Sequence, residues 1–334
     1  MKNLLLGEFK TLNENAFLLK YENDYGLDDI LEQGVKSIGS LVSFLQKRYK
    51  AKKGDIKMNK GGYACTTFNA VNEAGQYIFA RNFDYKEAPC IVVWTAPEKG
   101  YKSVAVTDTN VMLYGKKVGE KENKNRLLMA PYACMDGINE KGLAIAVVEI
   151  KTKATKQETG KKPITTTVAI RAALDKCATV DEVVELFSKY DMHDSLFCNY
   201  HYQVTDANGK SVVIEYVNNE MRVIEPEEGK NQYLLNFYLS KDGDNQKGFG
   251  YTREKWLHEE FNETKCVMSE ERAMQILKRC KLFYKHKRGY MITSLWSAVY
   301  NNNEKTMLFC ANMEYDKQYK FSVDYDKAES FANK

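Results

Sequence analysis

One cysteine, one arginine and one aspartate lie near each other where the chain becomes rich in β-branched and aromatic residues. Cys65 begins one such segment, and Arg81 and Asp84 lie at the end of the next. A cation beside a thiol lowers its pKa and favours the nucleophilic thiolate. Free cysteine is also among the most buried residue types, and exposed arginine–aspartate pairs are common. These residues alone therefore leave open a nucleophilic site or a core thiol beside an ordinary ion pair.

The motifs of several other chemistries are missing from the chain. It contains no G-x-x-x-x-G-K-[ST], G-x-G-x-x-G, H-E-x-x-H or G-x-S-x-G sequence. Its 4 histidines never occur at metal-ligand spacing, and none of its 8 cysteines forms a C-x-x-C pair. We therefore expect neither a metal nor a cofactor. A papain-like cysteine–histidine pair stays formally open, although no local signature supports it.

A cysteine needs no histidine if it is the first residue of its chain. Its own α-amine, with a pKa near 7.7–8.0, then serves as the general base. The thiol of the same residue is intrinsically nucleophilic. Cys65 meets this requirement only if the peptide bond between Ala64 and Cys65 is cut.

Residues 65–85 resemble the start of the mature choloylglycine hydrolase family, which comprises linear-amide C–N hydrolases of the N-terminal-nucleophile superfamily. The family pattern is Cys-Thr, a strand, a short turn and a strand that ends in Arg-Asn-x-Asp. Cys65, Arg81, Asn82 and Asp84 match it. Further resembling blocks follow in order over the remaining chain, at residues 136–147, 204–216, 233–238, 251–256 and 294–309.

The resemblance implies a role for each matched position. Cys65 would attack the amide carbonyl and become acylated, while Arg81 would favour its thiolate. Asp84 would hold the α-ammonium group of the new terminus. Asn236 would donate its side-chain N–H to the oxyanion, and Arg253 would complete the charge network around the cysteine.

Two further positions are expected at the substrate and oxyanion site. Glu149 falls where bile salt hydrolases carry asparagine and penicillin V acylases carry tyrosine. A glutamate at this position resembles the acid ceramidase and N-acylethanolamine amidase branch. A carboxylate cannot donate a hydrogen bond unless it is protonated. We therefore expect the backbone N–H of Glu149 to be the donor, and place Asn82 at the same site.

The segment before Cys65 differs from the rest of the chain. Apolar residues recur at helical spacing between Ile30 and Leu45, with charges between them. The pattern predicts one amphipathic helix that ends near the basic run at 47–53. We accordingly expect residues 1–64 to form a helical propeptide and linker, removed by self-cleavage, and residues 65–334 to form the hydrolase domain.

Hairpins and helices alternate along the expected domain. Residues 63–71 and 76–85 predict a β-hairpin, and 136–137 predict a turn before a strand buried on both faces. Residues 164–177 and 179–190 predict helices, and residues 232–240 predict a further strand. This order indicates an α+β protein. The resemblance specifies a four-layer αββα sandwich of two antiparallel sheets.

Composition and charge limit the partners. A net charge of +4, from 49 basic and 45 acidic residues, does not indicate nucleic acid. No apolar run approaches the ~18 residues that span a bilayer, and the N-terminus lacks a secretory apolar segment. We therefore expect a cytoplasmic protein with no membrane partner, and leave open whether identical chains associate.

The expected function is hydrolysis of a small-molecule N-acyl amide, a linear non-peptide amide, through a thioester on Cys65. Two alternatives stay open. An acyltransferase on the same fold would pass the acyl group to an amine instead of water. A catalytically inactive binding protein would keep its N-terminal segment as a permanent lid or partner-binding element.

Overall fold

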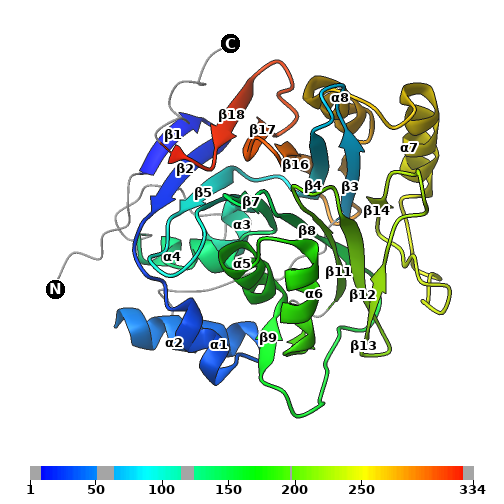
Figure 1. Cartoon of the computed structure of the whole chain (residues 1–334). Coiled ribbons are helices and arrows are strands. Elements are labelled where there is room, and N and C mark those ends of the chain that lie inside the picture. The colour runs from blue at the N-terminus through cyan, green and yellow to red at the C-terminus, as the bar shows by residue number, and fades with distance from the viewer. Residues whose placement is uncertain (1–8, 51–63, 114–123, 196–197, 326–334) are drawn as a thin grey trace.

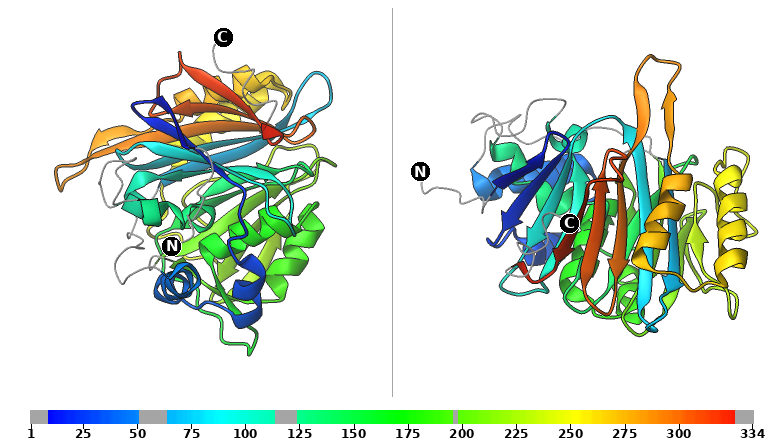
Figure 2. Two further views of the ribbon diagram at one scale, coloured as in Figure 1. Left: turned by 90° about the vertical axis from the view of Figure 1, so that its left-hand side faces the viewer. Right: turned by 90° about the horizontal axis from the view of Figure 1, so that it is seen from above.

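Two stacked β-sheets with helices on both outer sides form the molecule (Figures 1 and 2). The structure is a computed structural model that describes residues 9–50, 64–113, 124–195 and 198–325. In the left panel of Figure 2 the sheets lie one above the other, with α7 (Tyr251–Thr264) and α8 (Glu270–Arg279) on one outer side. Helices α5 (Thr166–Lys176) and α6 (Val180–Ser188) lie on the other. The predicted α+β fold with large antiparallel sheets is confirmed.

Sheet A has nine strands. In spatial order they are β1 (Phe9–Asn13), β2 (Ala16–Tyr21), β5 (Cys90–Thr95), β6 (Ser103–Asp108), β7 (Asp136–Asn139), β8 (Ala144–Ile150), β11 (Asn199–Thr205), β12 (Ser211–Val217) and β13 (Glu220–Ile224). All neighbours pair antiparallel except β2 and β5, which run parallel. Every residue of β8 is buried, as its apolar run predicts for a strand covered on both faces.

Sheet B has seven strands. They are β14 (Tyr233–Leu234), β3 (Ala64–Val71), β4 (Tyr77–Lys86), β16 (Met291–Asn301), β17 (Thr306–Ala311) and β18 (Gln318–Ser322), with β15 (Phe283–Lys285) paired to β16. The pairing of β3 with β4 confirms the predicted hairpin. Strands β9 (Pro163–Thr165) and β10 (Asp191–His193) form a separate parallel pair. Short helical segments are α3 (Thr109–Leu113), α4 (Lys124–Leu127) and η2 (Ala130–Tyr132).

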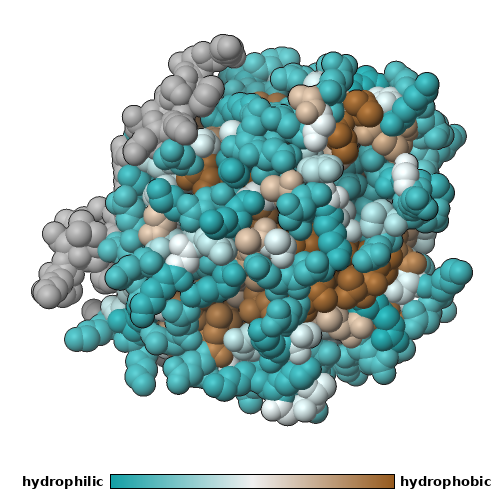
Figure 3. Space-filling model, viewed as in Figure 1, coloured by the Kyte–Doolittle hydropathy of each residue, from teal (hydrophilic) through white to brown (hydrophobic). Residues whose placement is uncertain are grey.

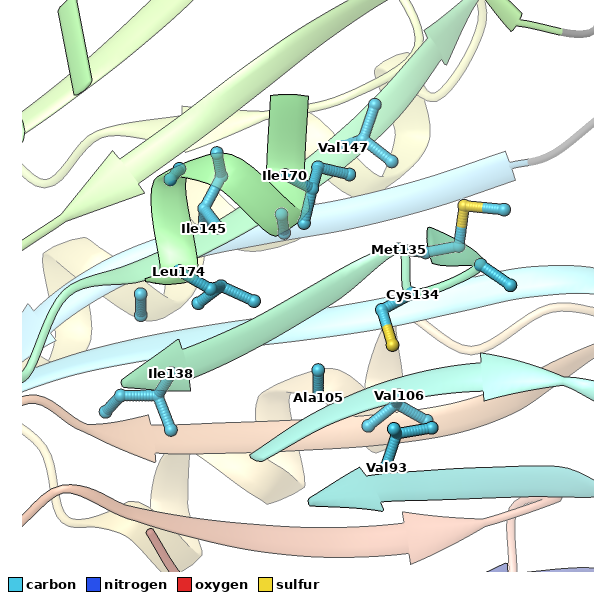
Figure 4. Close-up of a cluster of buried hydrophobic side chains, with 14 of the residues drawn as sticks. Val93, Ala105, Val106, Cys134, Met135, Ile138, Ile145, Val147, Ile170 and Leu174 are labelled. Carbon is cyan, nitrogen blue, oxygen red and sulfur yellow. The ribbon is translucent and has the colours of Figure 1, made fainter. Parts of the chain in front are cut away.

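The packing of α5 on sheet A shows how the outer helices are held (Figure 4). Ile170 and Leu174 of this helix lie against Ile138 of β7 and Ile145 of β8, and all four side chains are 0% exposed. Burying one such aliphatic side chain contributes roughly 1.5–3 kcal/mol. Helix α6 begins with its predicted cap, where the Thr179 side chain accepts a hydrogen bond from the backbone of residue 182.

The N-terminal segment is not the single helix that its spacing predicts. It contains β1 and β2 and two helices, α1 (Leu27–Gln33) and α2 (Ile38–Tyr49). The break falls at Gly34, whose φ of 79° lies in the left-handed region. Leu19, Ile30 and Leu45 from this segment are 0% exposed within the main core.

Two other local predictions differ from the structure. Asp136 and Gly137 begin strand β7 instead of forming a turn. A glycine is required there because the neighbouring strand β6 lies so close that a Cβ at position 137 would lie 2.7 Å from the Cβ of Ala105. The strand expected over 232–240 is shortened to β14. Beyond it the backbone of Asn236 pairs with that of Phe249 as an isolated bridge.

Hydrophilic side chains cover most of the face shown in Figure 3, with hydrophobic residues visible between them. No helix within the described ranges combines the length and apolar character needed to cross a bilayer. All eight cysteines are free. Cys198 and Cys266 are half-buried, whereas the other six are buried.

Candidate active site

The hairpin of β3 and β4 carries four of the residues predicted for catalysis and substrate binding, Cys65, Arg81, Asn82 and Asp84. Cys65 lies opposite Phe83 in the antiparallel register, and Arg81 lies two residues further along the same face. This face points toward sheet A, because Nη1 of Arg81 donates to the carbonyl oxygen of Val147 in β8 at 2.7 Å. The Cys65 side chain is 1% exposed and belongs to the core between the sheets.

Asn236 and Arg253 hold the backbone of Cys65 from both sides. The peptide N–H of Cys65 donates to Oδ1 of Asn236 at 3.0 Å, and Nη1 of Arg253 donates to the Cys65 carbonyl oxygen at 2.6 Å. The two side chains also meet, since Nη2 of Arg253 donates to Oδ1 of Asn236 at 2.9 Å. Asn236 and Arg253 follow Cys65 by 171 and 188 positions in the sequence, and the fold brings both to its peptide unit.

The start of helix α7 positions Arg253. Gly250, which precedes the helix, has a φ of 109°, a conformation that favours glycine. A Cβ there would also lie 2.9 Å from Nη2 of Arg253. Gly250 therefore permits both the turn into the helix and the close passage of the guanidinium.

Asp84 joins this network through Arg253. Its carboxylate lies 3.4 Å from Nη1 of Arg253 and accepts a hydrogen bond from the hydroxyl of Ser294 in β16. Burial raises the pKa of Asp84 to about 6, although the Arg253 cation opposes the shift. In the continuous chain the N–H of Cys65 donates to Asn236, so the predicted pairing of Asp84 with a free α-amine stays a prediction.

The thiol of Cys65 is protonated in the continuous chain. Burial raises its pKa to about 12, while the charge of Arg81 acts in the opposite direction. The effect of Arg81 on the pKa of Cys65 thus has the predicted direction, but the effect of desolvation is larger. A buried, protonated thiol is a poor nucleophile toward an external substrate.

Asp136 is a site residue that the sequence reasoning missed. Its carboxylate forms an ion pair with Nε of Arg81, and both side chains are fully buried. Trp296 Nε1 donates to it at 2.9 Å and the Tyr300 hydroxyl at 2.6 Å. The resembling block at 136–147 begins with this aspartate, so the signal was present, but its meaning depends on Arg81 lying opposite in the other sheet.

Glu149 reaches the site through its backbone. Its carbonyl oxygen accepts a hydrogen bond from Nδ2 of Asn236 at 2.9 Å. Its side chain is 2% exposed and lies close to Cys198, whose pKa is raised to about 12 by burial and by the Glu149 carboxylate. The predicted donation of its N–H to an oxyanion stays a prediction.

Asn82 is not brought to the site. Its side chain is on the opposite face of β4 from Arg81, where Nδ2 donates to the carbonyl oxygen of Leu277 at 2.7 Å. Its Oδ1 accepts from the hydroxyl of Ser297 at 2.6 Å. The amide therefore fastens α8 to sheet B, and the placement of Asn82 at the substrate site is corrected.

A second buried group fixes the segment that carries Asn236. Nε2 of His201 lies 2.8 Å from the carbonyl oxygen of Leu235, and Nδ1 lies 3.0 Å from Glu215. Glu215 also accepts the backbone N–H of Leu239 at 2.8 Å. Anchored on both sides, the side chain of Asn236 has little freedom to leave Cys65.

The described residues contain no group of three or more histidine, cysteine, aspartate or glutamate side chains that could hold a metal ion. What the site offers is one thiol, two guanidinium groups, two carboxylates and one amide. That set fits nucleophilic attack on a carbonyl with charge stabilisation by fixed donors.

The two stacked sheets and the outer helices define the fold of the N-terminal-nucleophile hydrolases, and solved structures share it. A mutant of conjugated bile acid hydrolase from Clostridium perfringens is 14% identical, with a TM-score of 0.56, and the match covers 77% of this chain and 92% of that one. A second variant of that enzyme is also 14% identical, with a TM-score of 0.57, and the match covers 78% of this chain and 93% of that one. Penicillin V acylase from Agrobacterium tumefaciens is 17% identical, with a TM-score of 0.54, and the match covers 77% of this chain and 86% of that one.

The sequence adds the family to the fold. Residues 65–233 match the family described as linear amide C-N hydrolases, choloylglycine hydrolase family. This protein belongs to that family. The match begins at Cys65, the residue that the site surrounds.

Proposed function

We propose that this protein hydrolyses a small-molecule N-acyl amide with Cys65 as the nucleophile, after cutting its own chain between Ala64 and Cys65. The observation that carries the proposal is the double grip on the Cys65 peptide unit by Asn236 and Arg253. Hydrogen bonds of this kind hold a reacting group in one geometry. Residues 1–64 are then a propeptide and residues 65–334 the mature chain.

The first reaction removes the propeptide. The Cys65 sulfur attacks the carbonyl carbon of Ala64, and its proton passes to the Cys65 nitrogen. The C–N bond to Cys65 then breaks to leave a thioester and a free α-amine. Water then hydrolyses the thioester, which restores the thiol and leaves residues 1–64 as a separate piece that ends in a carboxylic acid. Until that step the α-amine is part of a peptide bond and cannot act as a base.

The second reaction is the hydrolysis of substrate. The new α-amine takes the thiol proton, and the thiolate forms a thioester with the acyl group of the substrate. The leaving amine takes the proton back, and water releases the acid. Asn236 would donate its side-chain N–H to the oxyanion, an effect worth roughly 3 kcal/mol in such sites. Asp84 holds the ammonium form of the terminus, and Arg253 completes the charge network around Cys65 and Asp84.

The substrate is proposed only as a chemical class. Solved structures with the same fold include a conjugated bile acid hydrolase and a penicillin V acylase. Glu149 puts a buried carboxylate beside the site, which disfavours a substrate with an anionic group at that point. We therefore infer a neutral or cationic amine portion next to Glu149.

The proposal is tested by mass spectrometry of the denatured protein together with a substrate panel. We expect a chain that begins at Cys65 and release of amine from at least one of penicillin V, glycine- and taurine-conjugated bile salts, N-acyl amino acids and N-acylethanolamines. An active protein in which residues 1–64 stay covalently attached would exclude the free-amine mechanism.

Self-cleavage is expected to depend on the ionisation of Asp84. Because burial raises its pKa to about 6, the carboxyl is charged above that pH and neutral below it. Between pH 7 and pH 5 its ionised fraction falls about tenfold, and with it the support for Arg253. Newly synthesised chains, sampled over time by mass spectrometry at each pH, give the rate of cleavage.

The Asp84→Asn variant is the control, because the thiol also titrates. The ratio of the wild-type rate to the variant rate is expected to fall about tenfold over this range. A ratio that stays constant between pH 7 and pH 5 contradicts a role for the Asp84 charge.

A further inference from the structure

One β-hairpin extends beyond the body of the molecule. Strands β15 and β16 pair from Phe283 with Thr293 to Lys285 with Met291, and the hairpin projects past the two sheets in both panels of Figure 2. Its turn is closed by a hydrogen bond from the N–H of His286 to the carbonyl oxygen of Tyr290 at 2.8 Å. The arm is thus an ordered element with a defined tip.

The hairpin and its base carry positive charge that no acid among the described residues balances. Lys281, Lys285, Lys287 and Arg288 are exposed, and residues 272–303 contain no aspartate or glutamate. Within the described ranges none of these four side chains forms an ion pair. The rest of the chain is nearly balanced, since the net charge of the whole is +4. The hairpin is therefore a local cationic surface.

The same strand exposes aromatic side chains. Phe283 is 65% exposed and Tyr284 is 48% exposed. Single exposed apolar residues are common, but neighbouring exposed rings surrounded by polar side chains are typical of interaction surfaces. Aromatic rings flanked by lysine and arginine are the composition that enters the boundary between lipid head groups and acyl chains.

The base of the hairpin is tied to the candidate active site. The N–H of Leu282 donates to Oγ of Ser294 at 2.9 Å, and this hydroxyl donates to Asp84. A surface bound by the hairpin would therefore lie beside the end of β4 that carries Asp84. This places the arm where it could bring the enzyme to amides held in a lipid layer.

We propose that the β15–β16 hairpin docks on an anionic phospholipid surface. The four cations are attracted to the negative head groups, and Phe283 and Tyr284 insert at the head-group level. Charge selects this occupant over a second copy of the chain, because two such hairpins repel each other. The contact is peripheral, and it differs from the sequence-based expectation that no membrane is a partner. It goes beyond the proposed function and does not depend on it.

Co-sedimentation of the full chain with vesicles tests the docking. We expect binding to vesicles of phosphatidylcholine with about one third phosphatidylglycerol, and none to pure phosphatidylcholine. Each lost cation reduces binding about fivefold, so the triple variant Lys285→Ser, Lys287→Ser, Arg288→Ser should bind roughly 100-fold more weakly. Phe283→Ser, which removes an inserted ring, should weaken binding roughly tenfold.

Matched variants control for net charge and for lost apolar surface. Lys102, Lys241 and Lys247 are exposed lysines outside the hairpin, and their triple change to serine removes the same charge. Val223, which is 41% exposed, gives the apolar control Val223→Ser. Both controls should bind like the wild type, and circular dichroism should show that every variant is folded.

Four results would overturn the proposal. They are no binding of the wild type to anionic vesicles, equal loss in the hairpin and control triple variants, no effect of Phe283→Ser, and hairpin-dependent self-association in the absence of lipid. None of these readouts uses amide hydrolysis, so an inactive protein that binds vesicles through the hairpin would reject the proposed function and retain the docking.

Discussion

Replacing Cys65 by alanine is expected to leave the chain uncut and to reduce amide hydrolysis by at least about 10⁴-fold. The change removes the sulfur that forms both proposed thioesters, while the backbone grip by Asn236 and Arg253 remains available. Mass spectrometry of the denatured variant should therefore show residues 64 and 65 still joined. Amine release from the best substrate of the panel gives the loss of activity.

The loss must be specific to this thiol. Cys266→Ala is a suitable control because Cys266 is a half-buried free cysteine that takes no part in the contacts with Asn236 and Arg253 that hold Cys65. It should be cut and active like the wild type. Normal cleavage of the Cys65→Ala protein, or equal inactivation of both variants, would contradict the assignment of the nucleophile.

Asp136→Asn is expected to lower the free energy of unfolding by about 3–5 kcal/mol. The change leaves the guanidinium of Arg81 buried without its carboxylate, in a site that is 0% exposed. Nη2 of Arg81 already has no hydrogen-bond partner, so the cation has no ready substitute. Urea unfolding in the Cys65→Ala background gives the value without interference from cleavage.

Tyr300→Phe is the matched comparison for Asp136. It removes one hydrogen bond to the same carboxylate but keeps the charge, and should cost only about 1 kcal/mol. If Asp136→Asn were as mild as Tyr300→Phe, the ion pair would not be what keeps Arg81 in place. When Cys65 is kept, the Asp136→Asn variant should also be cut more slowly than the wild type, because Arg81 then loses its orientation.

Local patterns in the sequence predict much of the fold. The alternation around the turn at 72–76 predicts the hairpin of β3 and β4, and the capping residue Thr179 predicts the start of α6. Strands β1 and β2 were missed because the helical spacing that follows them dominated the segment. Their place depends on pairing with β5, which lies about 70 residues further along the chain and cannot be read locally.

The site divides in the same way. Spacing alone brings Cys65, Arg81 and Asp84 to one hairpin, but Asn236 and Arg253 could be assigned only through the family resemblance. Asn82 shows the limit of a motif, because neighbouring residues on a strand point to opposite faces. Asp136 shows the converse limit, since its partner Arg81 lies in the other sheet.

The parallel pairing of β2 with β5 has a consequence for a chain cut before Cys65. Residues from β2, α1 and α2 fill the main core, so the two pieces would stay together as a noncovalent complex. Before cleavage they fold as one molecule, with the high effective concentration that a covalent link provides. After cleavage, refolding becomes a bimolecular reaction that slows with dilution. Maturation would then make recovery from denaturation dependent on protein concentration, and a matured molecule that loses its first piece could not rebuild sheet A alone.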